Sequence, residues 1–153
     1  MERVIFFFVI QLAASAYALA RGGAPERIVG AALLIAAVAG RILQAPAVTR
    51  FIGIDWGVLG IDVALMFVLL GVALYADRFW PLWLAAFQIL GTGGHIVRGM
   101  DSDVARIAYA ILLASWSYPM LLLLVVGTAR HGARLRRHGY DLDWSHRAQG
   151  ALP

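Results

Sequence analysis

Residues Trp56 to Ala76 read WGVLGIDVALMFVLLGVALYA, an apolar run between Asp55 and Asp77 that contains a single charged residue, Asp62. Because the hydrocarbon core of a bilayer is about 30 Å thick, a helix of roughly 20 apolar residues crosses it. The apolar residues are continuous rather than alternating, which favours a helix over the strand of a membrane barrel. This segment therefore predicts a transmembrane helix.

The whole chain has the composition of a membrane protein. Of its 153 residues, 61% are hydrophobic and 14% are charged, and the mean hydropathy is +0.77. A soluble domain carries about 25% charged residues, so these charges are too few to cover a surface that faces water. The chain has no cysteine, and all 13 of its basic residues are arginine. Disulfides, thiolate chemistry, Schiff-base lysines and a P-loop are thereby excluded.

Charged residues divide the chain into five apolar runs joined by short connections. We predict an all-α, polytopic membrane protein, in which consecutive helices are antiparallel neighbours in one bundle. Residues 1–129 form the transmembrane bundle and residues 130–153 form a basic cytoplasmic tail. The five transmembrane helices are expected at about residues 4–20, 28–44, 56–76, 79–98 and 106–129.

Arginines near the ends of the runs predict the orientation, because cytoplasmic loops are enriched in basic residues. With the N-terminus outside and the C-terminus inside a bacterial cytoplasmic membrane, eight arginines lie inside and five outside. The competing interpretation is a cleavable signal peptide that ends near Ala16 to Ala18. Cleavage would leave four helices and place the arginine-rich tail outside, so we favour five. The eight inside residues are Arg21, Arg27, Arg78, Arg130, Arg134, Arg136, Arg137 and Arg147.

Three ionisable residues are predicted to share the outer half of the membrane. Asp62 lies about 9 Å below the outer start of its helix at ~1.5 Å per residue. His95 lies about one turn below the outer end of the next helix, and Arg41 lies near the outer end of the second. An unpaired charge in lipid is unfavourable by several kcal/mol. We therefore predict an Asp62–His95 or an Asp62–Arg41 pair that lines a pocket open toward the periplasm; the alternative is an ion pair that only fixes helix register.

Further polar and aromatic residues are candidates for the same pocket. Gln88, Thr92 and His95 follow one another at helical spacing and share one helix face, which must point inward. Trp116 and Tyr118 lie just before the helix-distorting Pro119, deep in the fifth run. These aromatic rings would either wall a pocket for a flat apolar ligand or only pack the bundle.

The sequence lacks the motifs of several familiar cofactor and metal sites. Haem held by two imidazoles needs a second histidine at membrane level, whereas His131, His138 and His146 lie in the tail. There is no HExxH motif, no zinc-like histidine–carboxylate triad and no glycine-rich phosphate loop. We therefore predict no catalytic residues and no metal ligands. The basic tail is expected to contact anionic lipid, or alternatively to dock another subunit.

Three stretches carry a resemblance to known proteins: FWPLWLAAFQILGTGGHIV at residues 79–97, WSYPMLLLLVVGTARH at 116–131, and RLRRHGYDLDW at 134–144. The chain resembles a group of small uncharacterised multi-pass membrane proteins of alphaproteobacteria, over most of its length. This resemblance implies no activity, cofactor or site.

The sequence favours an accessory membrane subunit, or a binder of an apolar cofactor or lipid, with a polar pocket in the outer-leaflet half. One alternative is a small proton-coupled transporter that uses Asp62 and His95. A weaker one is a membrane enzyme acting on a lipid or quinone. The cofactor is not identified, and the expected partners are membrane lipids, a larger membrane complex or a second copy, not nucleic acid. The predicted binding residues are Asp62, His95, Arg41, Gln88, Thr92, Trp116 and Tyr118.

Overall fold

The structure is a computed structural model that describes residues 2–43, 56–98, 103–141 and 143–144. This part of the chain forms five helices and no strand, which confirms the predicted all-α fold and the order of its helices. Residue 44, the predicted end of the second helix, and the tail beyond Trp144 lie outside the described residues. The helices are α1 (Glu2–Arg21), α2 (Ala24–Leu43), α3 (Trp56–Tyr75), α4 (Trp80–Arg98) and α5 (Asp103–His138).

Two helix boundaries differ from the prediction for local reasons. Helix α2 begins at Ala24, before the apolar run, because Pro25 suits the first turn of a helix. Helix α5 continues to His138, past the predicted membrane end at residue 129. It ends where Gly139 adopts a left-handed φ of 75° and donates its N–H to the Leu135 carbonyl at 2.9 Å.

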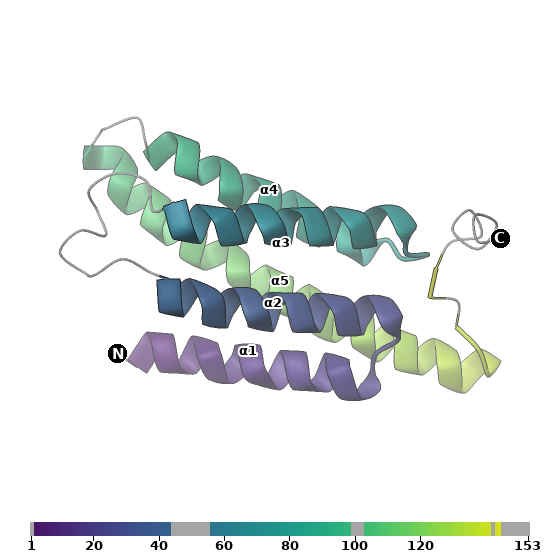
Figure 1. Ribbon diagram of the computed structural model, residues 1–153. Coiled ribbons are helices and arrows are strands. Elements are labelled where there is room, and N and C mark those ends of the chain that lie inside the picture. Colours follow the sequence, from purple (N-terminus) through teal and green to yellow (C-terminus); the bar gives the residue numbers. More distant parts are fainter. Residues whose placement is uncertain (1, 44–55, 99–102, 142, 145–153) are drawn as a thin grey trace.

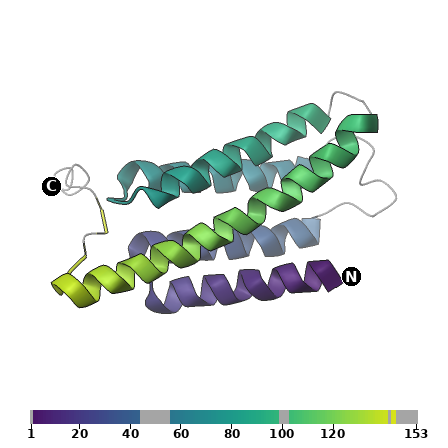
Figure 2. The ribbon, with the colours of Figure 1, turned by 180° about the vertical axis from the view of Figure 1, so that it is seen from behind.

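The helices run alternately in opposite directions and form a closed ring (Figures 1 and 2). Each helix packs against the next along the chain, α5 returns to α1, and α5 also contacts α2. The α1–α2 and α3–α4 turns lie at the end of the bundle where α5 finishes, which we call the α5-terminal end. All five helices can therefore contribute side chains to the axis of the bundle.

The α1–α2 turn at this end depends on glycine. A Cβ at Gly22 would lie 2.5 Å from the Ala18 carbonyl oxygen and 2.5 Å from the Glu26 Cβ, so a larger residue does not fit. The Gly22 N–H donates to the same carbonyl at 2.9 Å. This turn places the start of α2, including Glu26, directly against the end of α1.

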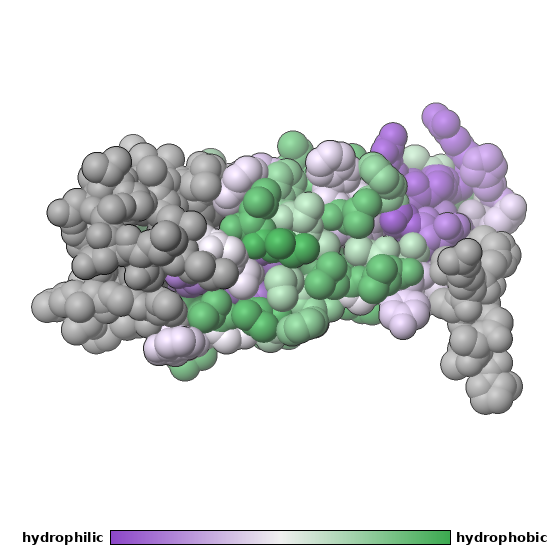
Figure 3. All heavy atoms as spheres, turned by 90° about the horizontal axis from the view of Figure 1, so that it is seen from above, coloured by the Kyte–Doolittle hydropathy of each residue, from purple (hydrophilic) through white to green (hydrophobic). Residues whose placement is uncertain are grey.

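The bundle is apolar on the inside and, over its middle, also on the outside. Small and aliphatic residues such as Ala18, Val29, Leu69 and Leu124 are buried in the core. Figure 3 shows hydrophobic side chains over the middle of one outer face and hydrophilic ones toward the α5-terminal end. Two stretches, Val4–Arg21 and Trp56–Tyr75, are long and apolar enough to cross a membrane.

Candidate functional site

The predicted contact between Asp62 on α3 and His95 on α4 is present. The Nε2 atom of His95 lies 2.8 Å from Oδ2 of Asp62. The His95 side chain is only 2% exposed, whereas that of Asp62 is 26% exposed. A polar pair of this kind is favourable in an apolar bundle because each group satisfies the other. The more accessible partner is therefore the carboxylate.

Gln88 provides a second connection between the same helices. Its Nε2 donates to the Asp62 backbone carbonyl at 3.2 Å and to Asp62 Oδ1 at 3.4 Å. Because Gln88 and His95 lie on one face of α4, both carboxylate oxygens of Asp62 have a partner on that helix. The predicted polar face of α4 thus points to α3 and holds Asp62 in one orientation.

A small cavity lies on the bundle axis beside this carboxylate. Its volume is about 180 Å³, and residues of all five helices line it. Gln11, Asp62, Gln88 and Ser117 form its polar lining, and the Gln11 amide also donates to Ser15 at 3.1 Å. At ~30 Å³ per water molecule, the cavity holds about six waters. A whole drug-sized ligand needs roughly 300–1,000 Å³, so the central cavity suits only a small polar group.

Two other predicted residues, Thr92 and Trp116, do not line this cavity and have buried polar atoms. Thr92 Oγ1 and Trp116 Nε1 are both buried and have no hydrogen-bond partner among the described residues. The Trp116 ring packs against Phe87, with ring centroids 5.3 Å apart and an angle of 31° between the ring planes. Trp116 therefore contributes to the contact between α4 and α5.

The other two predicted residues lie elsewhere. The Tyr118 side chain is 41% exposed and makes an edge contact with Phe7, at 5.6 Å between ring centroids. Arg41 is exposed at the end of α2 and lines a groove of about 620 Å³ with apolar residues of α1 and α2, such as Phe8 and Leu12. Of the two predicted pairings, the structure therefore brings Asp62 to His95, and it places Arg41 along the outer groove.

Sequence reasoning missed a second polar cluster, which surrounds Arg78 at the α5-terminal end. The Arg78 side chain is 4% exposed, and its Nε lies 3.3 Å from Oε1 of the fully buried Glu26. Its terminal nitrogens lie 2.8 and 3.0 Å from the Asp141 carboxylate and 3.5 Å from Asp143. In the sequence, Arg78 indicated a helix boundary and the orientation of the chain, but not a buried cluster. Glu26 lies before the predicted second helix, at residues 28–44, and no pattern singled it out.

Asp141 is bound from three sides. In addition to Arg78, His131 Nδ1 lies 2.7 Å from its Oδ2 and Arg134 Nε lies 2.8 Å from its Oδ1. Burial raises the pKa of Asp141, but hydrogen bonds from Arg134, His131 and Arg78 outweigh burial and hold that pKa below its usual range. Its charged form is thus favoured in the folded protein.

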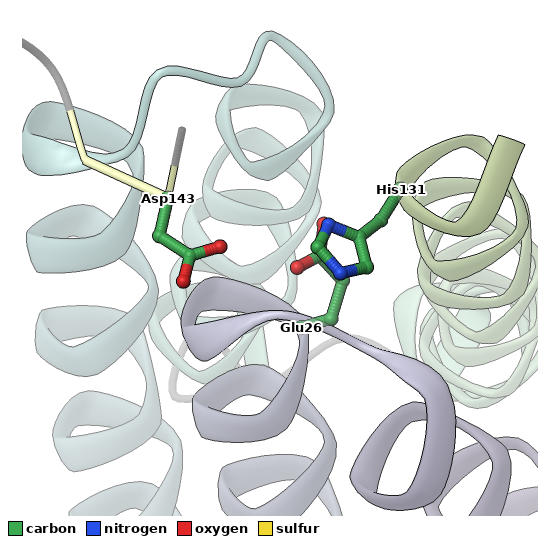
Figure 4. A group of neighbouring side chains, drawn as sticks. All are labelled: Glu26, His131 and Asp143. Carbon is green, nitrogen blue, oxygen red and sulfur yellow. The ribbon is translucent and has the colours of Figure 1, made fainter. Parts of the chain in front are cut away.

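The same cluster contains a group of residues with metal-ligand chemistry, which we call the carboxylate–histidine group. Figure 4 shows Glu26 from the start of α2, His131 from α5 and Asp143 from the tail pointing toward one another. One potential ligand atom from each lies within 4.8 Å of the others. These three residues are far apart in the sequence, so no spacing motif indicates the group, and the fold brings them together. Arg78, however, already places a positive guanidinium against both carboxylates.

These ion pairs fix the beginning of the tail on the bundle. Trp144 forms an antiparallel bridge with Ala76 and packs against the core, and the Asp77 N–H donates to the Asp143 carbonyl at 3.4 Å. The described part of the tail thus contacts its own chain. The expected contact with anionic lipid and the alternative docking of another subunit stay predictions.

No family model, curated protein or solved structure matches this chain. The resemblance to small alphaproteobacterial membrane proteins stays a prediction. The function must therefore be argued from the two polar clusters and the cavities beside them.

Proposed function

We propose that the chain is a five-span protein of the bacterial cytoplasmic membrane, with its N-terminus outside and its C-terminus inside. Two helices support insertion by length and apolarity. The other three present large apolar side chains outward, for example Ile35 on α2, Leu90 on α4 and Leu122 on α5. Such surfaces are unfavourable in water and favourable in lipid. The arginine distribution supports the orientation.

Within that bundle, we propose that the central cavity binds the small polar head of an apolar cofactor or lipid, and that the protein acts as an accessory subunit carrying it. The observation behind this proposal is that the polar lining comes from four different helices and includes the partly exposed carboxylate of Asp62. Asp62 accepts hydrogen bonds, whereas the amides of Gln11 and Gln88 and the hydroxyl of Ser117 offer donors and acceptors. With about 180 Å³ available, the apolar part of the ligand lies outside the cavity.

The test is to purify the protein in a mild detergent and identify bound quinones and lipids by extraction and mass spectrometry. The informative variant is Asp62→Asn, which preserves side-chain size. Asp77→Asn makes the same chemical change at an exposed position of the α3–α4 turn. Because a hydrogen bond to a charged group contributes about 1.5–3 kcal/mol, we expect Asp62→Asn to weaken retention about tenfold or more. Equal retention by both variants, or no enriched ligand in the wild type, would contradict the proposal.

Proton-coupled transport is the second candidate, and the Asp62–His95 contact of 2.8 Å beside a cavity that can hold several water molecules favours it. Vesicles that contain the protein would then show a flux driven by a pH gradient. Asp62→Asn would abolish that flux and Asp77→Asn would preserve it. A membrane enzyme that uses His95 as acid or base has less support, because Asp62 lines the cavity and the buried His95 lies behind it.

A further inference from the structure

A larger groove lies at the α5-terminal end, between the end of α1, the start of α2 and α5. Its volume is about 660 Å³. Three arginines line it, each from a different helix: Arg21, Arg27 and Arg136. Tyr17 and Leu135 contribute an aromatic and an aliphatic wall. The groove thus combines concentrated positive charge with apolar surface.

The charges in this groove are not neutralised within the described part of the chain. Arg78 and Arg134 are both paired with Asp141. In contrast, Arg21, Arg27 and Arg136 are exposed, and no described carboxylate lies within 4.0 Å of them. Arg78 and Arg134 therefore hold the tail, whereas the three arginines that line the groove are available to a ligand.

Arg136 forms part of the wall of the groove. A Cβ placed on Gly132 would lie 3.9 Å from Nη1 of Arg136, and both residues line the groove. The Arg136 guanidinium therefore lies along the groove and not away from it. Arginine binds phosphate oxygens through two parallel hydrogen bonds.

We propose that this groove binds the phosphate head group of an anionic phospholipid from the cytoplasmic leaflet. The inference rests on the proposed membrane insertion and orientation, but not on the ligand of the central cavity. Basic pockets between helices on the cytoplasmic side are suited to such head groups. The volume is much larger than one phosphate ion requires and falls within the range of ligand pockets, and the apolar walls suit the glycerol and upper acyl region of a lipid.

The experiment compares two double variants with the same change in net charge. Arg27→Gln/Arg136→Gln removes two arginines of the groove. Arg130→Gln/Arg137→Gln removes two exposed arginines of α5 that do not line it. Binding of phosphatidylglycerol to the detergent-solubilised full chain is measured by native mass spectrometry, with phosphatidylcholine and inorganic phosphate as comparison ligands.

We expect the wild type to prefer phosphatidylglycerol to phosphatidylcholine. The groove variant should bind phosphatidylglycerol about 10- to 30-fold more weakly, because each basic residue near an anionic lipid surface contributes about a factor of five, and the control variant should bind like the wild type. Equal losses in both variants would show non-specific charge attraction and overturn the proposal. Millimolar inorganic phosphate that fully displaces the lipid would overturn it in favour of a free-phosphate site.

Two further measurements separate this inference from the proposed function. Asp62→Asn is expected to keep its phosphatidylglycerol binding, and the groove variant is expected to keep the ligand of the central cavity. Resistance of the wild-type chain to alkaline extraction from membranes tests insertion alone. If no ligand of the central cavity is found, the result for the groove still stands. If alkaline extraction releases the wild-type chain from membranes, both proposals lose their basis.

Discussion

Replacing Arg78 by methionine should destabilise the protein more than any other single loss of charge in the bundle. The guanidinium contacts Glu26, Asp141 and Asp143, and the Glu26 side chain is fully buried. Removal of one partner from a buried ion pair leaves an uncompensated charge, at a typical loss of about 3–5 kcal/mol. Methionine fills most of the volume, so the loss measures charge and hydrogen bonding more than a cavity.

The expected order of the variants follows from the same contacts. Glu26→Gln removes one charge but leaves Arg78 with its contacts to Asp141 and Asp143, so its effect should be smaller than that of Arg78→Met. Arg78→Lys retains the positive charge but loses the planar guanidinium that reaches several carboxylates. Its loss of stability should be larger than that of Glu26→Gln and smaller than that of Arg78→Met. The double variant Glu26→Gln/Arg78→Met should recover part of the stability, because the buried charge is then absent.

The assay is equilibrium unfolding in mixed detergent micelles, with Arg130→Met as the control at an exposed position of α5. A loss of about 3 kcal/mol corresponds to an increase of about 100-fold in the unfolding equilibrium constant. If Arg78→Met and Arg130→Met unfold at the same denaturant concentration, the ion pairs around Arg78 do not stabilise the fold and the reasoning fails.

Three further outcomes are expected. Hydrogen bonds hold the pKa of Asp141 below its unfolded value. The contribution of Asp141 to stability is therefore present above about pH 4 and is lost as the pH falls through the folded pKa. Thermal unfolding from pH 7 to pH 3 should show the wild type losing its stability advantage over Asp141→Asn. In Arg78→Ala, the carboxylate–histidine group is freed from its guanidinium, and Zn²⁺ should raise the unfolding temperature of this variant but not of the wild type. Gly127→Ala should destabilise the protein by about 1–3 kcal/mol, because the new Cβ would lie 2.7 Å from the Trp80 indole. The control Gly60→Ala meets no described atom within 4 Å and should leave the stability unchanged when both variants are unfolded with denaturant.

Much of the fold could be predicted because the few charged residues of the chain separate long apolar runs. Charges that interrupt apolar runs locate the helix ends, and Asp62 stands out as an exception that needs a partner. Comparing depths along neighbouring antiparallel helices then pointed to His95, and the spacing of Gln88 placed it on the same face. The choice between His95 and Arg41 could not be made from sequence, since depth alone does not specify the direction in which a side chain leaves its helix.

The cluster around Arg78 could not be predicted for a different reason. Its members lie near helix ends or in the tail, where charged residues are normal and carry no signal of burial. Glu26 and Asp141 are far apart in sequence, and no periodicity indicates that the tail returns to the α3–α4 turn. Only the tight glycine turn before α2 and the return of Trp144 to Ala76 bring these groups together.

The return of the tail to the α3–α4 turn has a consequence for the order in which the protein can be assembled during synthesis. Contacts between α3 and α4, including Asp62 with His95, need only the first 95 residues. Arg78 at that stage has Glu26 as a partner, whereas its pairing with Asp141 awaits nearly the whole chain. The ring is likewise open until α5 packs on α1. A nascent chain that lacks α5 therefore leaves the ring open, and one that contains α5 but ends before residue 141 still leaves Arg78 without its Asp141 partner.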